Sequence, residues 1–300
     1  MSLEDLLNRH DILYEFWCSS FKKIWDKRAH QKNVREYNNI KAKMSDIQTI
    51  KVSIPFCDVS FNMELTNEGH NVSFYNIVKG NEIYESETTK FICKTLKNNF
   101  NCIDVGANNG YYSILMSIIG GSDAMVYSFE PMPDSYRLLA DKCKGQGNVC
   151  TFNAALGSES GSMGLNFETE ADGTASGIRL PSHRNRIKVP VTTLDHELID
   201  KGLISLHRPT LIKIDVEGFE LDVIKGGSKL LSVLDECYVI FEYVKYYYYM
   251  RKISYDALFQ LFNAIGFEIF LLRSDGTQLK KIKDHREIGS LNANLVAIKK

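Results

Sequence analysis

Short apolar runs separated by helical stretches dominate the chain from residue 101 onward. Continuous apolar runs that alternate with helices are typical of a parallel sheet covered on both faces. The pattern therefore predicts an α/β domain with a doubly wound sheet of seven strands. These strands are expected at Cys102–Ile103, Met125–Phe129, Val149–Ala154, Leu211–Ile214, Tyr238–Phe241, Phe267–Leu272 and Leu295–Ile298.

Two smaller units are expected before this domain. Residues 1–50 are polar and helix-prone, with one apolar face formed by Leu6, Leu7, Ile12, Phe16 and Phe21. Such a face more often packs on its own domain than on a partner, although contact in a homo-oligomer stays open. Residues 51–85 predict a β-hairpin lead-in, with strands at 52–56 and 72–78 around a turn-like stretch at 67–71. A helix over 86–97 then opens the main domain, 86–300.

A long Gly- and Ser-rich stretch, residues 157–186, interrupts the alternation between the third and fourth strands. Loops of this length are usually functional lids or disordered segments. Within it, residues 163–167 have the pattern of one extra strand, so part of the stretch is expected to be ordered beside the sheet.

Composition and charge limit the classes of binding partner that are expected. With 36 basic and 37 acidic residues, the formal charge of −1 gives no electrostatic support for nucleic-acid binding, so a small molecule or a glycan is the expected substrate. The start has no basic and apolar signal pattern, and no run of about 18 apolar residues predicts a membrane span. Seven scattered cysteines without a C-x-x-C pair indicate reduced thiols in a cytoplasmic protein.

The first strand of the main domain runs into a glycine-containing turn that predicts a ligand site. Asp104 ends the strand, Gly106 and Gly110 frame the turn, and Tyr111 begins a helix whose N–H groups can meet an anionic ligand group. Dinucleotides and S-adenosylmethionine both use such turns. Asn108 stands where a dinucleotide fingerprint needs its second glycine. The Asp104 carboxylate would repel a pyrophosphate but could meet an ammonium or sulfonium group, which favours S-adenosylmethionine.

The ends of the next two strands supply the rest of a nucleoside site. Glu130, followed by Pro131, lies about 20 residues after the turn, where an acid can hydrogen-bond both ribose hydroxyls. Asn153 and Ala154 end the third strand, where an amide and a small residue could read and cover an adenine. Taken with the turn, these four residues complete the predicted cofactor site.

An acidic group follows the fourth strand and predicts the catalytic centre. Asp215 and Glu217 are placed to take a proton from a hydroxyl, because neighbouring carboxylates raise one another's pKa. Glu242, Lys213 and His183 are the expected helpers. Asp215 is also a cofactor-binding candidate. Because these ligands are oxygen atoms, Mg²⁺ bound between Asp215, Glu217 and Glu242 is a further hypothesis.

Four sequence blocks resemble the FkbM family of S-adenosylmethionine-dependent methyltransferases. They are Ile103–Gly110, which includes Ala107; Phe129–Pro131; Ala154–Gly157; and Leu194–Asp195 followed by Lys213–Glu220. The resemblance implies a class I methyltransferase fold with strand order 3-2-1-4-5-7-6 and helices on both faces. It also implies O-methylation of a sugar, glycan or natural product, with Asp104–Gly110 near the methionyl end and Glu130 at the ribose. The family usually carries a small residue where Phe219 stands.

Two functions from other classes stay open at this point. An NAD(P)-dependent oxidoreductase is disfavoured by Asn108 and by the lack of a Tyr-x-x-x-Lys or Cys/His constellation near the sheet edge. A catalytically silent protein that binds a nucleotide or docks a partner is supported by the unexplained segment 1–50 alone.

Overall fold

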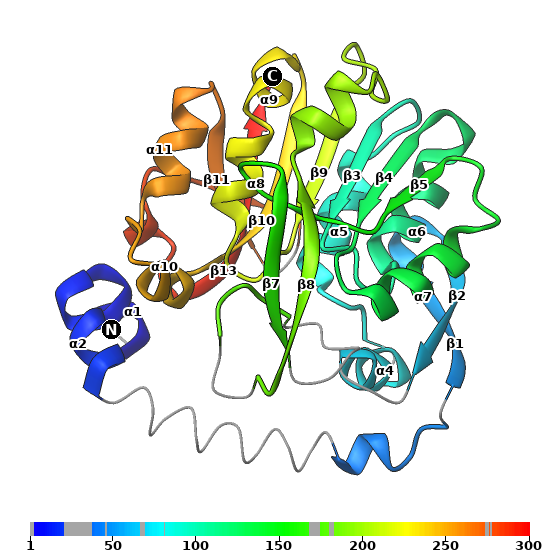
Figure 1. Cartoon of the computed structure of the whole chain (residues 1–300), viewed down its shortest axis with the longest axis horizontal. Coiled ribbons are helices and arrows are strands. Elements are labelled where there is room, and N and C mark those ends of the chain that lie inside the picture. Colours follow the sequence, from blue (N-terminus) through cyan, green and yellow to red (C-terminus); the bar gives the residue numbers. More distant parts are fainter. Residues whose placement is uncertain are drawn as a thin grey trace.

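An eight-stranded sheet forms the centre of the molecule in the computed structural model, which describes residues 3–20, 38–45, 47–66, 70–80, 82–167, 175–179, 183–273, 276 and 278–300. The strand order is β12-β11-β13-β10-β9-β3-β4-β5 (Figure 1). Strands β3, β4, β5, β9 and β10 are parallel, whereas β13 runs antiparallel to β10 and β11. The strands are β3 (Asn101–Val105), β4 (Met125–Phe129), β5 (Val149–Phe152), β9 (Thr210–Ile214), β10 (Cys237–Val244), β11 (Glu268–Leu272), β12 (Leu279–Ile282) and β13 (Asn292–Lys299).

The prediction of an α/β domain is confirmed, but the main sheet has eight strands, not the predicted seven. The additional strand is β12, which pairs with β11 at the edge of the sheet. In this strand two exposed lysines lie between Leu279 and Ile282, so the sequence contains no apolar run that would predict a strand. Lysines are common on edge strands because they oppose pairing with another chain.

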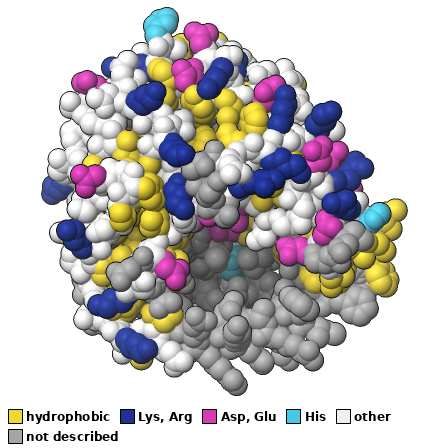
Figure 2. Space-filling model, turned by 180° about the vertical axis from the view of Figure 1, so that it is seen from behind, with side chains coloured by type: hydrophobic (Ala, Val, Ile, Leu, Met, Phe, Trp, Pro, Cys, Tyr) yellow, Lys and Arg dark blue, Asp and Glu magenta, His cyan; other side chains and the backbone are white. Residues whose placement is uncertain are grey.

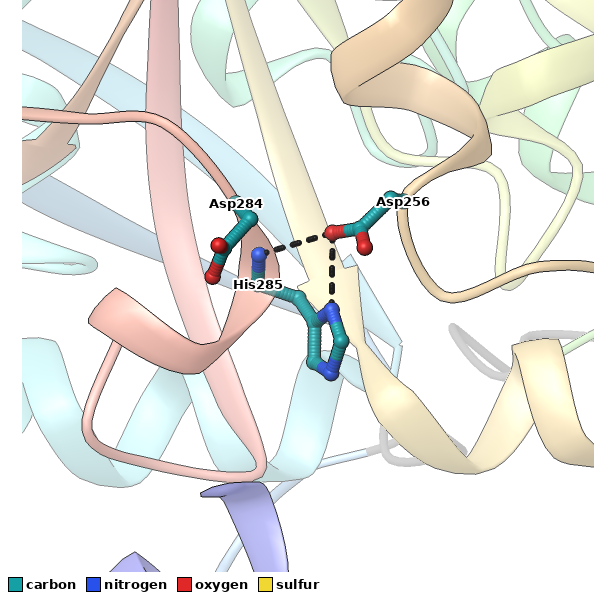
Figure 3. A group of neighbouring side chains, drawn as sticks. All are labelled: Asp256, Asp284 and His285. Atoms are coloured by element: carbon teal, nitrogen blue, oxygen red, sulfur yellow. Dashed lines mark hydrogen bonds and ion pairs between the residues drawn. The ribbon is translucent and has the colours of Figure 1, made fainter. Parts of the chain in front are cut away.

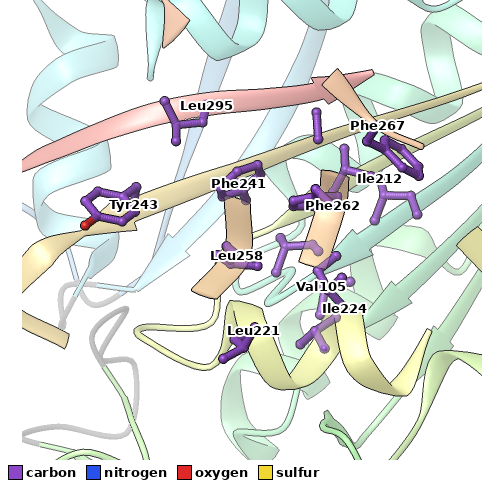
Figure 4. Packing of buried hydrophobic residues seen from close by; sticks show 14 of the residues in the cluster. Val105, Ile212, Leu221, Ile224, Phe241, Tyr243, Leu258, Phe262, Phe267 and Leu295 are labelled. Atoms are coloured by element: carbon purple, nitrogen blue, oxygen red, sulfur yellow. The ribbon is translucent and has the colours of Figure 1, made fainter. Parts of the chain in front are cut away.

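Helices cover both faces of the sheet, and successive strand residues contribute to two separate cores. Val105, Ile212 and Phe241 pack in the core under α8, α9 and α11 (Figure 4). Cys102, Leu211 and Ile240 face the opposite core, under α5 and α6. This division follows from the two-residue period of a strand. The helices are α5 (Ser86–Thr95), α6 (Tyr111–Gly120), α7 (Pro133–Cys143), α8 (Glu220–Gly226), α9 (Ser228–Val233), α10 (Lys245–Arg251) and α11 (Ala257–Ala264).

A β-hairpin precedes the main sheet, but its second strand was wrongly predicted. β1 (Ile47–Ile54) pairs with β2 (Val59–Thr66), and the predicted strand at 72–78 lies instead within helix α4 (His70–Lys79). Short apolar runs do not distinguish a buried helix from a strand. The period-2 signal lies in β2, where Val59, Met63 and Leu65 are buried.

The predicted extra strand at 163–167 is confirmed as part of β7 (Gly161–Phe167). It belongs to a second sheet of order β6-β8-β7, with β6 (Ala155–Leu156) and β8 (Asn185–Thr192). Residues 168–174 and 180–182 of the long stretch lie outside the described residues. β8 was not predicted, because its exposed polar residues and Pro190 interrupt the apolar pattern that is typical of a strand.

The N-terminal helices α1 (Leu3–Arg9) and α2 (Asp11–Ser20) pack against the C-terminal half of their own chain (Figure 1). Leu7 and Tyr14 are buried there, whereas Ile12 and Phe16 are exposed by 84% and 60%. Figure 2 shows the resulting apolar area at the side of the molecule. Phe21, predicted on the same face, lies outside the described residues. No described helix is long and apolar enough to span a bilayer.

A buried ammonium group holds the N-terminal helices in place. Lys245, at the start of α10, is fully buried, and its Nζ atom donates to the carbonyl oxygens of Leu7 and Asn8 at 3.1 and 2.7 Å. Nζ also lies 2.9 Å from Oδ1 of Asp11, the atom that lies 2.9 Å from Nε2 of His285. The end of α1, the start of α2 and the start of α10 therefore share one charged network.

Asp11→Asn is expected to lower the free energy of unfolding by about 1.5–3 kcal/mol, the range for hydrogen bonds to a charged group. The substitution removes the negative charge that faces Lys245. The control is Asp5→Asn, which breaks an exposed ion pair with Arg9 and should cost about 0–1 kcal/mol. Urea denaturation measures both variants, and equal losses would contradict the role assigned to Asp11.

Candidate active site

A cavity of about 340 Å³ opens at the carboxyl ends of β3, β4, β9 and β10. Its walls come from the residues that follow these strands, from the second sheet and from the segment before α5. The lining includes residues 105–109, 129–132, 154–156, 213–217 and 240–242, together with Tyr84, Glu85, Met163 and Leu165. In open α/β sheets, this edge is where ligands bind.

The glycines of the first turn are required by the protein's own packing. Gly106 has φ +80°, and a Cβ atom there would lie 1.9 Å from the carbonyl oxygen of Asp215. Gly110 has φ +84°, and a Cβ atom there would lie 2.9 Å from Cδ1 of Leu139 in α7. Asn108 also has a positive φ, 47°. Gly106 and Asn108 line the cavity with Ala107 and Tyr111, whereas Gly110 lies behind it.

Glu130 links the first turn to the end of β4. Its Oε2 accepts a hydrogen bond from the Asn108 N–H, and its Oε1 accepts one from the Met132 N–H, both at 2.8 Å. Burial raises its pKa to about 7 despite these two bonds. Glu130 and Pro131 line the cavity beside Ala154.

Asn153 takes a supporting position next to Glu130. Its side-chain amide donates to the carbonyl oxygens of Glu130 and Pro131 at 2.9 and 3.2 Å, and the residue is not among those lining the cavity. Recognition of an adenine by Asn153 stays a prediction. Its two hydrogen bonds to backbone carbonyl groups fix the turn that carries Glu130.

Asp104 lies beneath the cavity, not on its wall. Its Oδ2 accepts a hydrogen bond from the Ser113 hydroxyl at 2.6 Å, and the residue is 1% exposed. Burial raises its pKa, although Lys213, its direct neighbour on β9, opposes that shift. Oδ1 is buried and has no hydrogen-bond partner among the described residues. Strand alternation explains the placement, because Asp104 shares the face of Cys102, under α6.

Lys213 is a buried cation surrounded by carboxylates. Its Nζ lies 2.9 Å from Oδ2 of Asp215 and 4.6 Å from the centre of the Tyr112 ring. Burial alone would lower its pKa, but Asp215, Glu85 and Asp104 raise it above the ordinary value. Lys213 therefore stays protonated and keeps a positive charge at the base of the cavity.

The other predicted acids surround the same region of the cavity. Glu217 has φ 53° and accepts a short hydrogen bond from the Tyr247 hydroxyl. Burial, reinforced by Asp215, raises its pKa well above the ordinary value. Burial and the charge of Asp215 raise the pKa of Glu242 to about 8. Their raised pKa values make the ionised forms of these two carboxyl groups stronger bases than an ordinary glutamate.

Two predictions about this centre have different outcomes. His183 is buried and does not line the cavity, and its role as a helper stays a prediction. Within the described part of the chain, the one gathering of three possible metal ligands is Asp256, Asp284 and His285, so the Mg²⁺ site expected between Asp215, Glu217 and Glu242 is not supported. Nδ1 of His285 already lies 2.7 Å from Oδ1 of Asp256 (Figure 3). Its Nε2 lies 2.9 Å from Oδ1 of Asp11.

The structure adds residues that motif spacing did not indicate. Tyr84 and Glu85 reach the cavity from before α5, and Tyr112 reaches it from α6. Phe219 also lines it, with the Arg251 guanidinium 4.2 Å above the ring centre. The tyrosine run at 246–249 does not line the cavity, although the Tyr247 hydroxyl contacts Glu217.

Comparisons with known proteins match methyltransferases. The sequence profile described as "Methyltransferase FkbM domain" matches residues 104–269. The hexuronic acid methyltransferase AglP of Haloferax volcanii is 32% identical over 130 residues, which are 43% of this chain and 50% of that protein. The match thus spans about half the length of that relative.

Two solved structures are similar in fold. A methyltransferase FkbM from Methylobacillus flagellatus KT has 14% identity and a TM-score of 0.43, covering 89% of this chain and 59% of that one. SMU.1697c, a putative methyltransferase from Streptococcus mutans in complex with SAH, has 13% identity and a TM-score of 0.39, covering 70% and 94%.

Glu242→Gln should stabilise the protein increasingly as the pH rises from about 4.5 to about 8. In this window the unfolded carboxyl ionises while the folded one, with its pKa near 8, keeps its proton, so ionisation favours unfolding. Glutamine does not ionise. We expect no gain near pH 4.5 and a gain of about 1–3 kcal/mol at pH 8, since one pKa unit corresponds to about 1.4 kcal/mol. Denaturant titrations at both pH values measure it, with the exposed Glu159→Gln as control. A gain that does not depend on pH would contradict the raised pKa.

Proposed function

This chain belongs to the FkbM methyltransferase domain family, and on that premise we propose that it transfers a methyl group from S-adenosylmethionine to a hydroxyl oxygen of a sugar. What carries the proposal is the cavity at the carboxyl edge of the sheet, with Glu130 toward one end and Asp215, Glu242 and Lys213 toward the other. The sugar class is suggested by the relative named as a hexuronic acid methyltransferase.

The residues present fit the cofactor. Each carboxylate oxygen of Glu130 accepts one hydrogen bond from a backbone N–H group. Because a carboxylate can accept about four hydrogen bonds, Glu130 can also accept hydrogen bonds from ribose hydroxyls. Pro131 and Ala154 offer apolar contact beside it. The carboxylates at the other end favour a ligand with ammonium and sulfonium groups over one with a pyrophosphate. The family match also does not favour an NAD(P)-dependent oxidoreductase.

S-adenosylmethionine would supply an electrophilic methyl carbon, to which an acceptor oxygen could bond in line as the carbon–sulfur bond breaks and S-adenosylhomocysteine leaves. The chain must hold that oxygen in position and remove its proton. Glu242 is the base we propose, because it lines the cavity and its raised pKa makes its ionised form a stronger base. The Asp215 carboxylate is paired with the Lys213 ammonium at 2.9 Å, so Asp215 is better suited to orient groups than to accept a proton. Met163 and Leu165 of β7 line the cavity and would exclude water.

The proposal is tested by incubating the protein with S-adenosylmethionine and a panel of methyl glycosides that includes neutral hexosides, glucuronides and deoxy sugars. Formation of S-adenosylhomocysteine together with a gain of one methyl group on a sugar is the expected result. Binding of the cofactor without transfer to any sugar would support a silent binding protein. Hydride transfer with NAD(P) would support the oxidoreductase.

Glu130→Ala should weaken S-adenosylmethionine binding by about 1–3 kcal/mol, the range for losing hydrogen bonds to a charged group. The substitution also removes the hydrogen bonds that Glu130 accepts from the backbone N–H groups of Asn108 and Met132. Isothermal titration calorimetry measures the affinity, and the exposed Glu159→Ala is the control. Equal affinities for Glu130→Ala and the wild type would remove Glu130 from the cofactor site.

A further inference from the structure

Two residues before α5 lie on the wall of the cavity although they precede the family domain. Tyr84 and Glu85 line the cavity, whereas the family profile begins at residue 104. Glu85 immediately precedes α5 and has φ 38°, a backbone conformation that L residues rarely adopt. Such conformations persist where surrounding contacts impose them, and they occur often at functional sites.

Aromatic packing fixes this segment. The Tyr84 ring centre lies 5.1 Å from that of Phe74 in α4 and 5.3 Å from that of Tyr111 in α6. The Thr89 hydroxyl donates to the carbonyl oxygen of Tyr84 at 2.7 Å. Tyr84 is therefore held from α4, α5 and α6 at once, and the Glu85 side chain starts from a defined position.

The Glu85 carboxyl group is aimed at the catalytic end of the cavity. Its Oε2 accepts a hydrogen bond from the Tyr112 hydroxyl at 2.8 Å, and the Tyr112 ring lies under the Lys213 ammonium. Burial raises the pKa of Glu85, while the positive charge of Lys213 lowers it. Glu85 thus belongs to the same electrostatic group as Lys213 and Asp215, although it is far from them in sequence.

The position of Glu85 separates it from the cofactor end. Glu130 follows β4, whereas Lys213 and Glu242 belong to β9 and β10, on the other side of β3. Lys213 and Glu242 share the sheet face of Leu211 and Ile240, which is the face that α5 and α6 cover. A ligand whose ribose meets Glu130 would therefore present its reactive end toward Glu85 and Glu242.

We propose that Glu85 binds the acceptor sugar by accepting a hydrogen bond from a hydroxyl next to the one that is methylated. A carboxylate can accept about four hydrogen bonds, and Tyr112 and Tyr84 use two of them, so capacity for the sugar is left. The ligand class is a sugar ring with vicinal hydroxyls. This inference rests on the proposed function and adds a specificity residue from outside the family domain.

The test compares Glu85→Gln with the wild type on the best acceptor of the methyl glycoside panel and on its analogue that lacks the neighbouring hydroxyl. Glutamine keeps a side-chain oxygen for the Tyr112 hydroxyl but carries no charge. We expect the KM for the sugar to rise about 10- to 100-fold, the range for one hydrogen bond to a charged group, with the S-adenosylmethionine Kd within about twofold. In the wild type, the deoxy analogue should have a higher KM than the full sugar. In Glu85→Gln, the two KM values should be similar.

Two further variants keep the test decisive. Glu82→Gln removes an exposed carboxylate three residues earlier and should leave both constants unchanged. Tyr112→Phe removes the hydroxyl that orients Glu85 and should raise the sugar KM a few-fold, which tests the arrangement even if Glu85→Gln does not fold.

Contrary outcomes are distinguishable. An unchanged sugar KM in Glu85→Gln and Tyr112→Phe would overturn the inference and leave the proposed function intact. A Kd for S-adenosylmethionine that rises as much as the sugar KM would assign Glu85 to the cofactor and also overturn it. A wild-type protein that methylates no sugar would remove the proposed function and this inference together.

Discussion

The ammonium group of Lys213 is the charge on which the arrangement of the cavity depends. It lies near the carboxyl end of the buried strand β9, beside Asp104 on β3 and 2.9 Å from Asp215. Taking a cation out of water is costly unless negative groups surround it, and taking several carboxylates out of water is costly without a cation. Lys213 and the acids near it therefore stabilise one another. Removal of Lys213 would leave Asp215, Glu85 and Asp104 without their counter-charge.

The same group divides the acids by function. Asp215 is in direct contact with Lys213, whereas Glu242 carries a pKa near 8 because burial and the charge of Asp215 act on it without an equal compensating contact. The two carboxyl groups thus have different surroundings in one cavity. Asp215 is suited to orienting a cationic or hydroxyl group, and the ionised form of Glu242 is the stronger base.

Much of the fold and part of the site could be predicted because their signals are local. The apolar runs of β4 and β9, the turn with Gly106 and Gly110, and Glu130 at the end of β4 each depend on a few consecutive residues. Glu85 could not be predicted in this way, because its position depends on a positive φ and on packing between α4 and α6. The helix at 70–79 was mistaken for a strand for a related reason, since tertiary burial decides the conformation of a short apolar run. Asp104 could have been placed correctly, because the strand period already puts it on the face of Cys102.

The N-terminal helices connect to this cavity through α10. Lys245 at the start of α10 is held by carbonyl groups of α1 and by Asp11, and two residues further along Tyr247 binds Glu217. Arg251, at the end of α10, donates to the carbonyl oxygen of Gly218 at 2.7 Å and covers Phe219. One short helix therefore carries contacts to the N-terminal segment at one end and to the 217–219 loop along its length. Because Glu217, a non-glycine residue, has a positive φ, that loop requires outside contacts to keep its conformation, and α10 supplies them. The bulky Phe219 is accommodated by the same contacts, since its ring packs under a guanidinium group that is itself fixed by Asp222.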